Sequence, residues 1–431
     1  MAITDKSYDD KCETLVRQRK AHKKSRLGCK NCKLRGVKSF PSALQLEHRS
    51  AGPTFSVIDK TFGPINPGFR VPIIQPLKGS VGEIILDDAA LAAVERFRVR
   101  TVFSLGTERT RRVYTQGAFM LGFKVSMGDQ RIRLETDHPF LLHVFVALAL
   151  LHDQHLNPRQ APSQRTALAF HWYQATALFH RRLAAAGAIA DPSTLPGPER
   201  DALWASGALL GAASFALLDV EDVDAAWPLR ESDNLDLNWL RMSDGKKVVW
   251  ELSDPTRDGS IFQSLLKERD GMPDGSLPVP PGALPGVFYT TFDVGSSSTA
   301  ENNPYHTAVS LLAQLLPHKI DDNTVIKFLS FVSQVDPRFK KLLEEKDPGA
   351  MILLAWWYAK VAAHSSWWMQ RRSLIEGRAI CIYLERHGMD VEGIRELIEF
   401  PKRIFESCRE NGGNMTMEDK HALMSGMQIY I

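Results

Sequence analysis

Two cysteines near the start of the chain, Cys29 and Cys32, have the residue type and spacing of metal ligands. A turn between cysteines at this spacing brings both sulfur atoms to one side, where two thiolates can bind the same ion. A tetrahedral zinc site needs four ligands, so this pair supplies half of one. A redox role is disfavoured, because redox pairs normally lie between a strand and a helix, whereas a basic segment precedes this one. Two inert surface thiols are the remaining alternative.

The basic segment around the pair, residues 17–38, has the composition of a surface that contacts nucleic acid. It contributes ten positive charges and no acid, and subtracting ten from the net charge of +3 leaves −7 for the rest of the chain. A basic arm on a mildly acidic body is typical of polyanion-binding or nuclear-import segments, and a solvated charge run without function is the alternative. The side chains that we expect to contact DNA are Lys23, Lys24, Arg26, Lys30, Lys33, Arg35 and Lys38.

Composition and proline placement divide the 431-residue chain into three parts. Residues 1–39 form the basic arm, which we expect to be mostly disordered. Residues 40–82 hold six prolines and little periodicity, so we predict an extended linker. Residues 83–431 are predicted to be a helical domain with an exposed loop at 271–304, which is rich in proline, glycine and serine.

Helical periodicity recurs through this domain and no long alternating β-branched run is visible, so the predicted fold class is all-α. Residues 87–99 begin with acids that the helix dipole favours, and Pro139 suits the first turn of the helix that follows it. Ser163 is predicted to cap the next helix, and residues 234–240 are ambiguous between helix and strand. The other predicted helices cover residues 198–218, 305–316, 322–334, 337–345, 347–370, 371–387 and 391–409.

Neither a secreted nor a membrane-spanning chain is indicated. Residues 1–11 are polar without the apolar core of a signal peptide, and the five cysteines are too few and scattered for a disulfide framework. An intracellular, reducing compartment is therefore expected. Residues 202–218 carry no charge, but these 17 residues include two glycines and two serines and are at the lower limit for spanning a bilayer. We expect a buried core helix there and no membrane span.

The stretch 22–38, which contains both cysteines, resembles the opening of the fungal binuclear zinc-cluster transcription factors. The basic lead-in, Gly28 before the first cysteine and the lysine and arginine spacing all agree with that family's pattern. The family holds two zinc ions with six cysteines and has a basic helix between the second and third of them. The resemblance implies zinc as cofactor, DNA and the transcription machinery as partners, and the nucleus as location.

The chain departs from the family pattern after this opening. The third cysteine of the family falls at position 39, where Ser39 stands, and no further cysteine occurs before Cys381. A serine hydroxyl is too weakly acidic to replace a bridging thiolate, so the binuclear cluster cannot form with the cysteines present. Arg35 and Gly36 occupy the positions that approach base edges in the family, and Gly36 offers no side chain. We therefore expect weak or non-specific DNA binding.

Two explanations account for the missing cysteines. In the first, an exon that encodes them is absent from this product, which the abrupt change of composition after Lys38 favours. In the second, evolution has abandoned the cluster and kept the regulatory body. Both leave an arm whose contacts with DNA are directed at phosphates rather than at bases.

The helical body resembles the regulatory domain of sterol-uptake-control-type members of the same family over residues 83–405. The resemblance rests on residues 137–143, 239–242 and 353–360 and on the tryptophans that follow. In that family the body is α-helical and activates transcription, and in some members it encloses a sterol. The resemblance implies an apolar pocket, with the candidate lining residues Trp356, Trp357, Tyr358, Trp367 and Trp368. Ordinary core packing of these side chains is the favoured alternative, because large aromatics dominate protein cores.

No nucleophile, paired carboxylates or phosphate-binding loop can be nominated, so the chain is not predicted to be an enzyme. His143, His152 and His155 lie on or near one helix but lack a third ligand and a zincin glutamate, so we interpret them as satisfied or surface histidines. The acids between Asp219 and Asp224 are interpreted as a solvated helix end.

The predicted function is that of a fungal zinc-cluster-type regulator of RNA polymerase II genes, in sterol, lipid or secondary metabolism, with a defective DNA-binding head. The alternative is a helical ligand-binding or protein-interaction module without specific DNA binding. A sterol or another apolar molecule is the expected ligand in either case.

Overall fold

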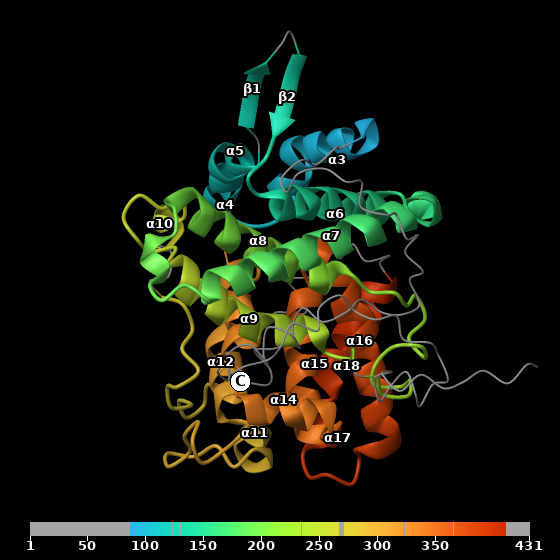
Figure 1. Cartoon of the computed structure of the whole chain (residues 1–431). Coiled ribbons are helices and arrows are strands. Elements are labelled where there is room, and N and C mark those ends of the chain that lie inside the picture. Colours follow the sequence, from blue (N-terminus) through green and yellow to red (C-terminus); the bar gives the residue numbers. More distant parts are fainter. Residues whose placement is uncertain are drawn as a thin grey trace, which may run out of the picture. The chain divides into compact units, whose positions relative to one another are not determined.

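The computed structural model describes residues 87–122, 124–128, 131–233, 235–266, 271–321, 324–364 and 366–410. The predicted arm at 1–39, its candidate metal and DNA contacts, and the predicted linker at 40–82 lie outside these residues. Within the described part the fold is helical, apart from one antiparallel hairpin, which confirms the all-α class (Figure 1).

The first half of the described chain contains three long helices. Pro139 stands in the first turn of α6, as expected from its fixed φ, and Asp87 caps α3 by accepting a hydrogen bond from the backbone N–H of Ala90. The elements are α3 (Asp88–Val99), η1 (Thr101–Ser104), α4 (Glu108–Arg112), the π-turn η2 (Val113–Ala118), α5 (Phe119–Leu121), β1 (Lys124–Gly128), β2 (Arg131–Glu135), α6 (Pro139–Leu156), η3 (Pro158–Gln160), α7 (Ala161–Gly187), η4 (Pro192–Thr194), α8 (Gly197–Ala216) and α9 (Asn238–Ser253).

The second half is a set of helices around α15, in which prolines or aspartates mark several starts. Asp336 and Asp347 cap α14 and α15, and a proline follows each of them at the first helical position. The elements are α10 (Gln263–Leu266), α11 (Gly286–Thr291), α12 (His306–Leu315), α13 (Val325–Gln334), α14 (Pro337–Glu344), α15 (Pro348–Ala362), α16 (Trp367–His387), α17 (Ile394–Leu397) and α18 (Glu399–Glu410).

Helix α15 lies at the centre of this second half, with α16 and α18 packed against it (Figure 1). Every residue from Gly349 to Ala362 is buried, which is the pattern of a helix that is apolar on all sides and surrounded by others. Its polar atoms reach backbone carbonyls on other elements. The indole of Trp356 donates to Leu397, that of Trp357 donates to Phe328, and the amine of Lys360 donates to Leu316.

Helix α6 has the same role in the first half, where it packs against α3, α7 and α8. Residues 140–153 are all buried. Its one buried carboxylate, that of Asp153, forms ion pairs with Arg96 at 3.0 Å and with Arg100. Within the described residues α6 is the helix whose length and apolar composition suffice to cross a membrane, and 78% of it is buried inside the fold. The uncharged stretch 202–218 lies largely within α8, whose apolar side chains are also buried.

The structure corrects several helix boundaries. The predicted helix at 347–370 is two helices, because α15 ends at Ala362 and α16 begins at Trp367 after an extended residue, Ser366. The predicted helix at 391–409 is also divided, into α17 and α18. Ser163 does not cap α7, which begins at Ala161 and contains Ser163 in its first turn.

Several elements had no counterpart in the sequence-based prediction, among them α9, α11 and the hairpin. Helix α9 begins at Asn238, inside the ambiguous segment 234–240, and the short helix α11 lies inside the predicted loop 271–304. The hairpin pairs β1 with β2 so that Val125 faces Leu134 and Met127 faces Ile132 across the strands. These apolar residues do alternate with other residues, but each strand has only five positions, which is too short for a convincing period of two.

A buried polar cluster joins α15 to α16. Glu376 accepts hydrogen bonds from the hydroxyl of Tyr358 and from the guanidinium of Arg372, and all three side chains are buried. Arg372 also lies over the rings of Phe215 and Trp239, at 5.7 and 5.9 Å from their centroids. Removing one partner of such a pair leaves an uncompensated charge in the core.

Glu376→Gln is therefore expected to lower the free energy of unfolding by about 3–5 kcal/mol, because the Arg372 guanidinium would lose its counter-ion in a buried place. The matched control is Glu385→Gln on the same helix, whose exposed pair with Lys402 is expected to be worth about 1 kcal/mol or less. Urea denaturation followed by circular dichroism measures both. Equal losses in the two variants would show that the buried pair does not stabilise the fold.

Candidate ligand-binding pocket

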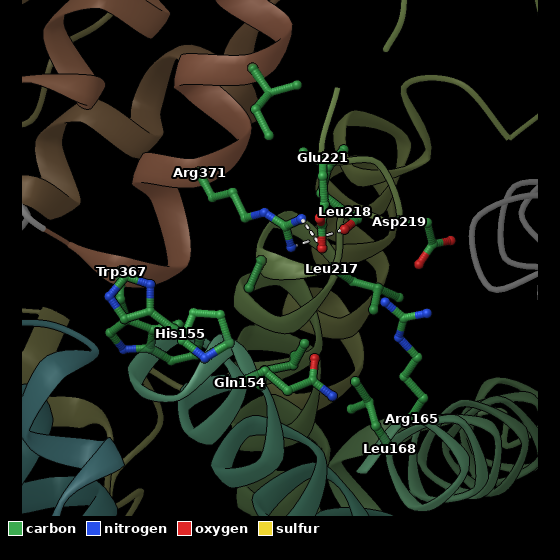
Figure 2. Close-up of a pocket in the computed structure, with 14 residues that line it drawn as sticks. Gln154, His155, Arg165, Leu168, Leu217, Leu218, Asp219, Glu221, Trp367 and Arg371 are labelled. Carbon is green, nitrogen blue, oxygen red and sulfur yellow. Dashed lines mark hydrogen bonds and ion pairs between the residues drawn. The ribbon is translucent and has the colours of Figure 1, made fainter. Parts of the chain in front are cut away.

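A pocket of about 710 Å³ opens where four helices meet (Figure 2). The C-terminal turn of α6, the beginning of α7, the end of α8 with the segment after it, and the first turns of α16 all contribute side chains. The apolar part of its wall consists of Leu151, Leu168, Ala216, Leu217, Leu218 and Ile375. A volume of this size is within the range of pockets that hold small organic ligands.

Trp367 completes the apolar wall and is held rigidly. Its indole N–H donates to the hydroxyl of Ser104 at 2.7 Å, and its ring stacks on that of His152, with centroids 4.7 Å apart and planes at 8°. His152 in turn lies 3.1 Å from the hydroxyl of Thr101. Burial, followed by the nearby charge of Arg100, lowers the pKa of His152 to about 4, so the ring that supports Trp367 is neutral at physiological pH.

Arg371 lies on the opposite side of the pocket from Gln154 and connects α16 to the segment after α8 (Figure 2). Its guanidinium donates to the carbonyls of Leu218 and Val220, at 3.2 and 3.1 Å. The next residue, Arg372, donates to the carbonyls of Phe215 and Leu217 at 2.9 and 2.6 Å. The last carbonyls of a helix have no partner within it, and two adjacent arginines supply partners here.

The mouth of the pocket carries charges of both signs. Arg165 from α7 and Arg371 from α16 are the cations, and Asp219 and Glu221 are the anions. Burial is the main cause that lowers the pKa of Arg371, while the nearby acids act in the opposite direction. Burial and then the charge of Arg371 lower the pKa of His155, which favours its neutral form.

Gln154 contributes the least satisfied polar group of the pocket. Its side-chain nitrogen Nε2 is buried, and among the described residues no acceptor lies within hydrogen-bonding distance. A buried amide donor without a partner costs about 1–3 kcal/mol, so an acceptor from a ligand or water would be favourable there.

The structure separates the five aromatic residues that were candidates for lining a pocket. Trp367 does line it, whereas Trp356, Trp357, Tyr358 and Trp368 are buried in the core. The adjacent residues Trp356 and Trp357 point to different neighbours, as their positions on a helix require. Trp356 packs on Phe400 with centroids 4.4 Å apart, and Trp357 stacks on Phe331 at 5.5 Å.

Sequence reasoning did not identify the polar residues of the pocket. Arg165, Gln154 and Arg371 each lie in an ordinary helical pattern, and their convergence depends on how α6, α7 and α16 pack. The one local signal was the run from Trp367 to Arg372, in which two aromatics and two arginines stand at the beginning of a helix. Four aromatic and cationic side chains within six residues, fewer than two helical turns, are more than a single buried face uses.

No group of three metal-binding side chains comes together among the residues that the structure describes. His152 and His155 have ring centroids 6.5 Å apart, but no third ligand joins them. The acids after α8 instead pair with arginines of α16 at longer range, Glu221 with Arg371 at 4.0 Å and Asp224 with Arg386 at 3.9 Å.

The chain matches no protein-family model, and no curated protein or solved structure is significantly similar to it. The function proposed below is therefore argued from the sequence pattern and from the geometry of the pocket.

Two buried histidines connect the helices α6 and α7 that line the pocket. The Nδ1 atoms of His143 and His171 are 2.9 Å apart, so one ring donates and the other accepts, which requires the accepting ring to be neutral. Burial lowers the pKa of His143 to about 3 and that of His171 to about 4, with the partner ring as a further cause for His143 and with Asp87 opposing the change at His171.

Stability is therefore expected to fall as the pH decreases from about 6.5 to about 4, since the unfolded chain takes up protons that the folded rings exclude. Above pH 6.5 this effect lowers stability little. At pH 4, His171 alone lowers the free energy of unfolding by on the order of 3 kcal/mol. The variant His143→Asn with His171→Asn keeps an amide at each Nδ1 position and should flatten this part of the profile. Denaturation midpoints at several pH values measure it.

The control is His318→Asn, because His318 is exposed. Its profile should follow that of the unmodified chain. A double variant whose stability still declined as steeply below pH 6.5 would assign the acid sensitivity to other groups.

Proposed function

We propose that the chain is a transcription regulator of the fungal zinc-cluster type, in which a helical body binds a ligand and a basic arm contacts DNA through its phosphates. The segregation of charge carries this proposal. Ten positive charges within residues 17–38 precede a remainder of net charge −7, and a Cys-x-x-Cys pair lies inside the positive segment. Such an arm is attracted to polyanions, and its place of action would be the nucleus.

The two cysteines limit what the arm can do. Cys29 and Cys32 offer two of the six thiolates that the binuclear cluster of the family requires, so zinc would at most be shared with ligands from elsewhere. Without the cluster, no folded scaffold directs Arg35 at base edges. The resulting affinity is electrostatic, depends strongly on salt and does not distinguish sequences.

The pocket supports the regulatory role of the body. It has an apolar wall of leucines, Ile375 and Trp367, so an apolar molecule such as a sterol is a suitable ligand. Its location bears on regulation as well, because Arg371 belongs both to the pocket and to the contact that fixes the end of α8. Occupancy can therefore change the surface that the body presents to the transcription machinery.

The pocket equally favours a second function, that of a ligand-binding or protein-interaction module that does not act on specific DNA sites. The incomplete set of cysteines favours this alternative too. In that case the arm serves for nuclear import or has no role, and the body acts by binding its ligand and other proteins.

Titration of DNA binding against salt tests the role of the arm. The full chain should bind two unrelated duplexes with equal affinity, and the logarithm of the binding constant should fall linearly with that of salt. Replacing Lys30, Lys33 and Arg35 by glutamine should reduce the slope by about 0.9 for each charge removed. Fluorescence anisotropy at several salt concentrations measures both quantities.

The matched control removes three exposed charges from the body, with Lys341→Gln, Arg386→Gln and Lys402→Gln, and should leave the slope unchanged. Tight binding to one duplex only, together with two zinc ions per chain by elemental analysis, would contradict the proposal. The absence of any DNA binding would leave the second function.

A further inference from the structure

The pocket has an unsatisfied hydrogen-bond donor in its interior and carboxylate acceptors at its mouth. The buried group is a donor, the amide nitrogen of Gln154, which has no acceptor among the described residues. The acceptors, the carboxylates of Asp219 and Glu221, are on exposed side chains at the mouth. Figure 2 shows the same order, with Gln154 beside the apolar wall and both acids near the end of α8. The unsatisfied polar group of the interior is therefore a donor.

Arg371 also has capacity for a further acceptor. A guanidinium has five N–H groups, and Arg371 gives one to each of two carbonyls, those of Leu218 and Val220. Its ion pair with Glu221 spans 4.0 Å, and the Glu221 side chain is 83% exposed. Pairs of this kind contribute little, so a second carboxylate can take the place of Glu221 without a large loss.

The electrostatic potential around Arg371 is positive. Arg165 is close enough to Arg371 that its charge lowers the pKa of Arg371, together with the larger effect of burial. His155, whose pKa the charge of Arg371 lowers further after burial, adds a ring N–H or acceptor to the pocket wall. An anionic group placed among these residues would relieve the repulsion between the two arginines.

The apolar wall begins directly beside these donors. Leu151 lies one turn before Gln154 and His155 on α6, and Ile375 lies one turn after Arg371 on α16, so each polar residue has an apolar neighbour on the same helix face. Leu168 and Trp367 extend the apolar surface between them. The ligand that matches this order has acceptor oxygens at one end and a hydrocarbon chain at the other.

We propose that the pocket binds an amphipathic carboxylate, a long-chain fatty acid, with its carboxylate on the Arg371 guanidinium and its chain along the leucines and Trp367. The inference rests on the ligand-binding role proposed for the body and names the class of ligand. A neutral sterol offers one hydroxyl and no charge to the two arginines, whereas a carboxylate forms a charge-assisted hydrogen bond with Arg371 and is attracted by Arg165 as well.

Fluorescence titration of the delipidated full chain with cis-parinaric acid, followed by competition, tests this assignment. Oleate should displace the probe at concentrations at least about tenfold lower than oleyl alcohol, which has the same chain without the charge. Ergosterol should also compete less well than oleate. The comparison of oleate with the alcohol isolates the carboxylate from the hydrophobic contribution.

Two pocket variants and one control locate the binding site. Arg371→Gln should weaken parinarate binding about tenfold or more and leave displacement by oleyl alcohol unchanged. Because Arg371 also supports the end of α8, Arg165→Gln is the second variant, which removes the other cation at the mouth of the pocket and should weaken parinarate binding several-fold. Arg386→Gln, on the same helix but outside the pocket, should have no effect.

The outcomes distinguish this inference from the function on which it rests. Equal competition by oleate and oleyl alcohol, or equal behaviour of the Arg371 and Arg386 variants, would overturn the carboxylate assignment. Binding of tritiated ergosterol by a chain that ignores parinarate would also overturn it, but would preserve a ligand-binding body. A chain that bound neither probe would lose the ligand-binding role, and the role of the arm would depend on the DNA titration alone.

Discussion

The burial of α15 on all sides is the constraint on which the second half of the described chain depends. Fourteen consecutive residues of this helix are removed from solvent, so the surrounding elements must enclose it completely and satisfy every polar atom it brings inside. The carbonyls of Leu397, Phe328 and Leu316 accept three of these hydrogen bonds, and the Glu376 carboxylate accepts that of the Tyr358 hydroxyl. Each of these bonds also fixes the position of the element that supplies the acceptor, so α15 orients its neighbours as well as packing against them.

The two arginines at the start of α16 fix the wall of the pocket in the same way, by hydrogen bonds to backbone carbonyls of another element. Arg372 faces the core, where it meets Glu376 and the last carbonyls of α8, while Arg371 lines the pocket and holds the carbonyls that follow. The first turns of α16 thus hold the end of α8 both from the core, through Arg372, and from the pocket, through Arg371. A rearrangement at the mouth of the pocket that moved Arg371 would act on the core through its neighbour Arg372, which is a short physical route for coupling the pocket to the core.

Local signals in the sequence were sufficient for much of the fold. Proline at a first-turn position identified α6, and α14 and α15 likewise begin with an aspartate followed by proline, because capping depends on neighbouring residues only. The break between α15 and α16 was missed, because the apolar pattern resumes at Trp367 after a short polar stretch that ends at Ser366, an extended residue. The pocket could not be derived, because Gln154, Arg165 and Arg371 approach each other through the packing of three helices, and Trp367 differs from Trp368 only by the face it occupies.

Trp367 also makes the pocket visible by spectroscopy. Its indole forms part of the pocket wall, whereas those of Trp356 and Trp357 are sealed in the core. Indole emission responds to the polarity of its surroundings and to quenchers that reach the ring. An occupant of the pocket would contact the Trp367 indole and change the polarity around it, whereas Trp356 and Trp357 do not line the pocket. The emission of Trp367 consequently reports whether the pocket is filled, without an added label.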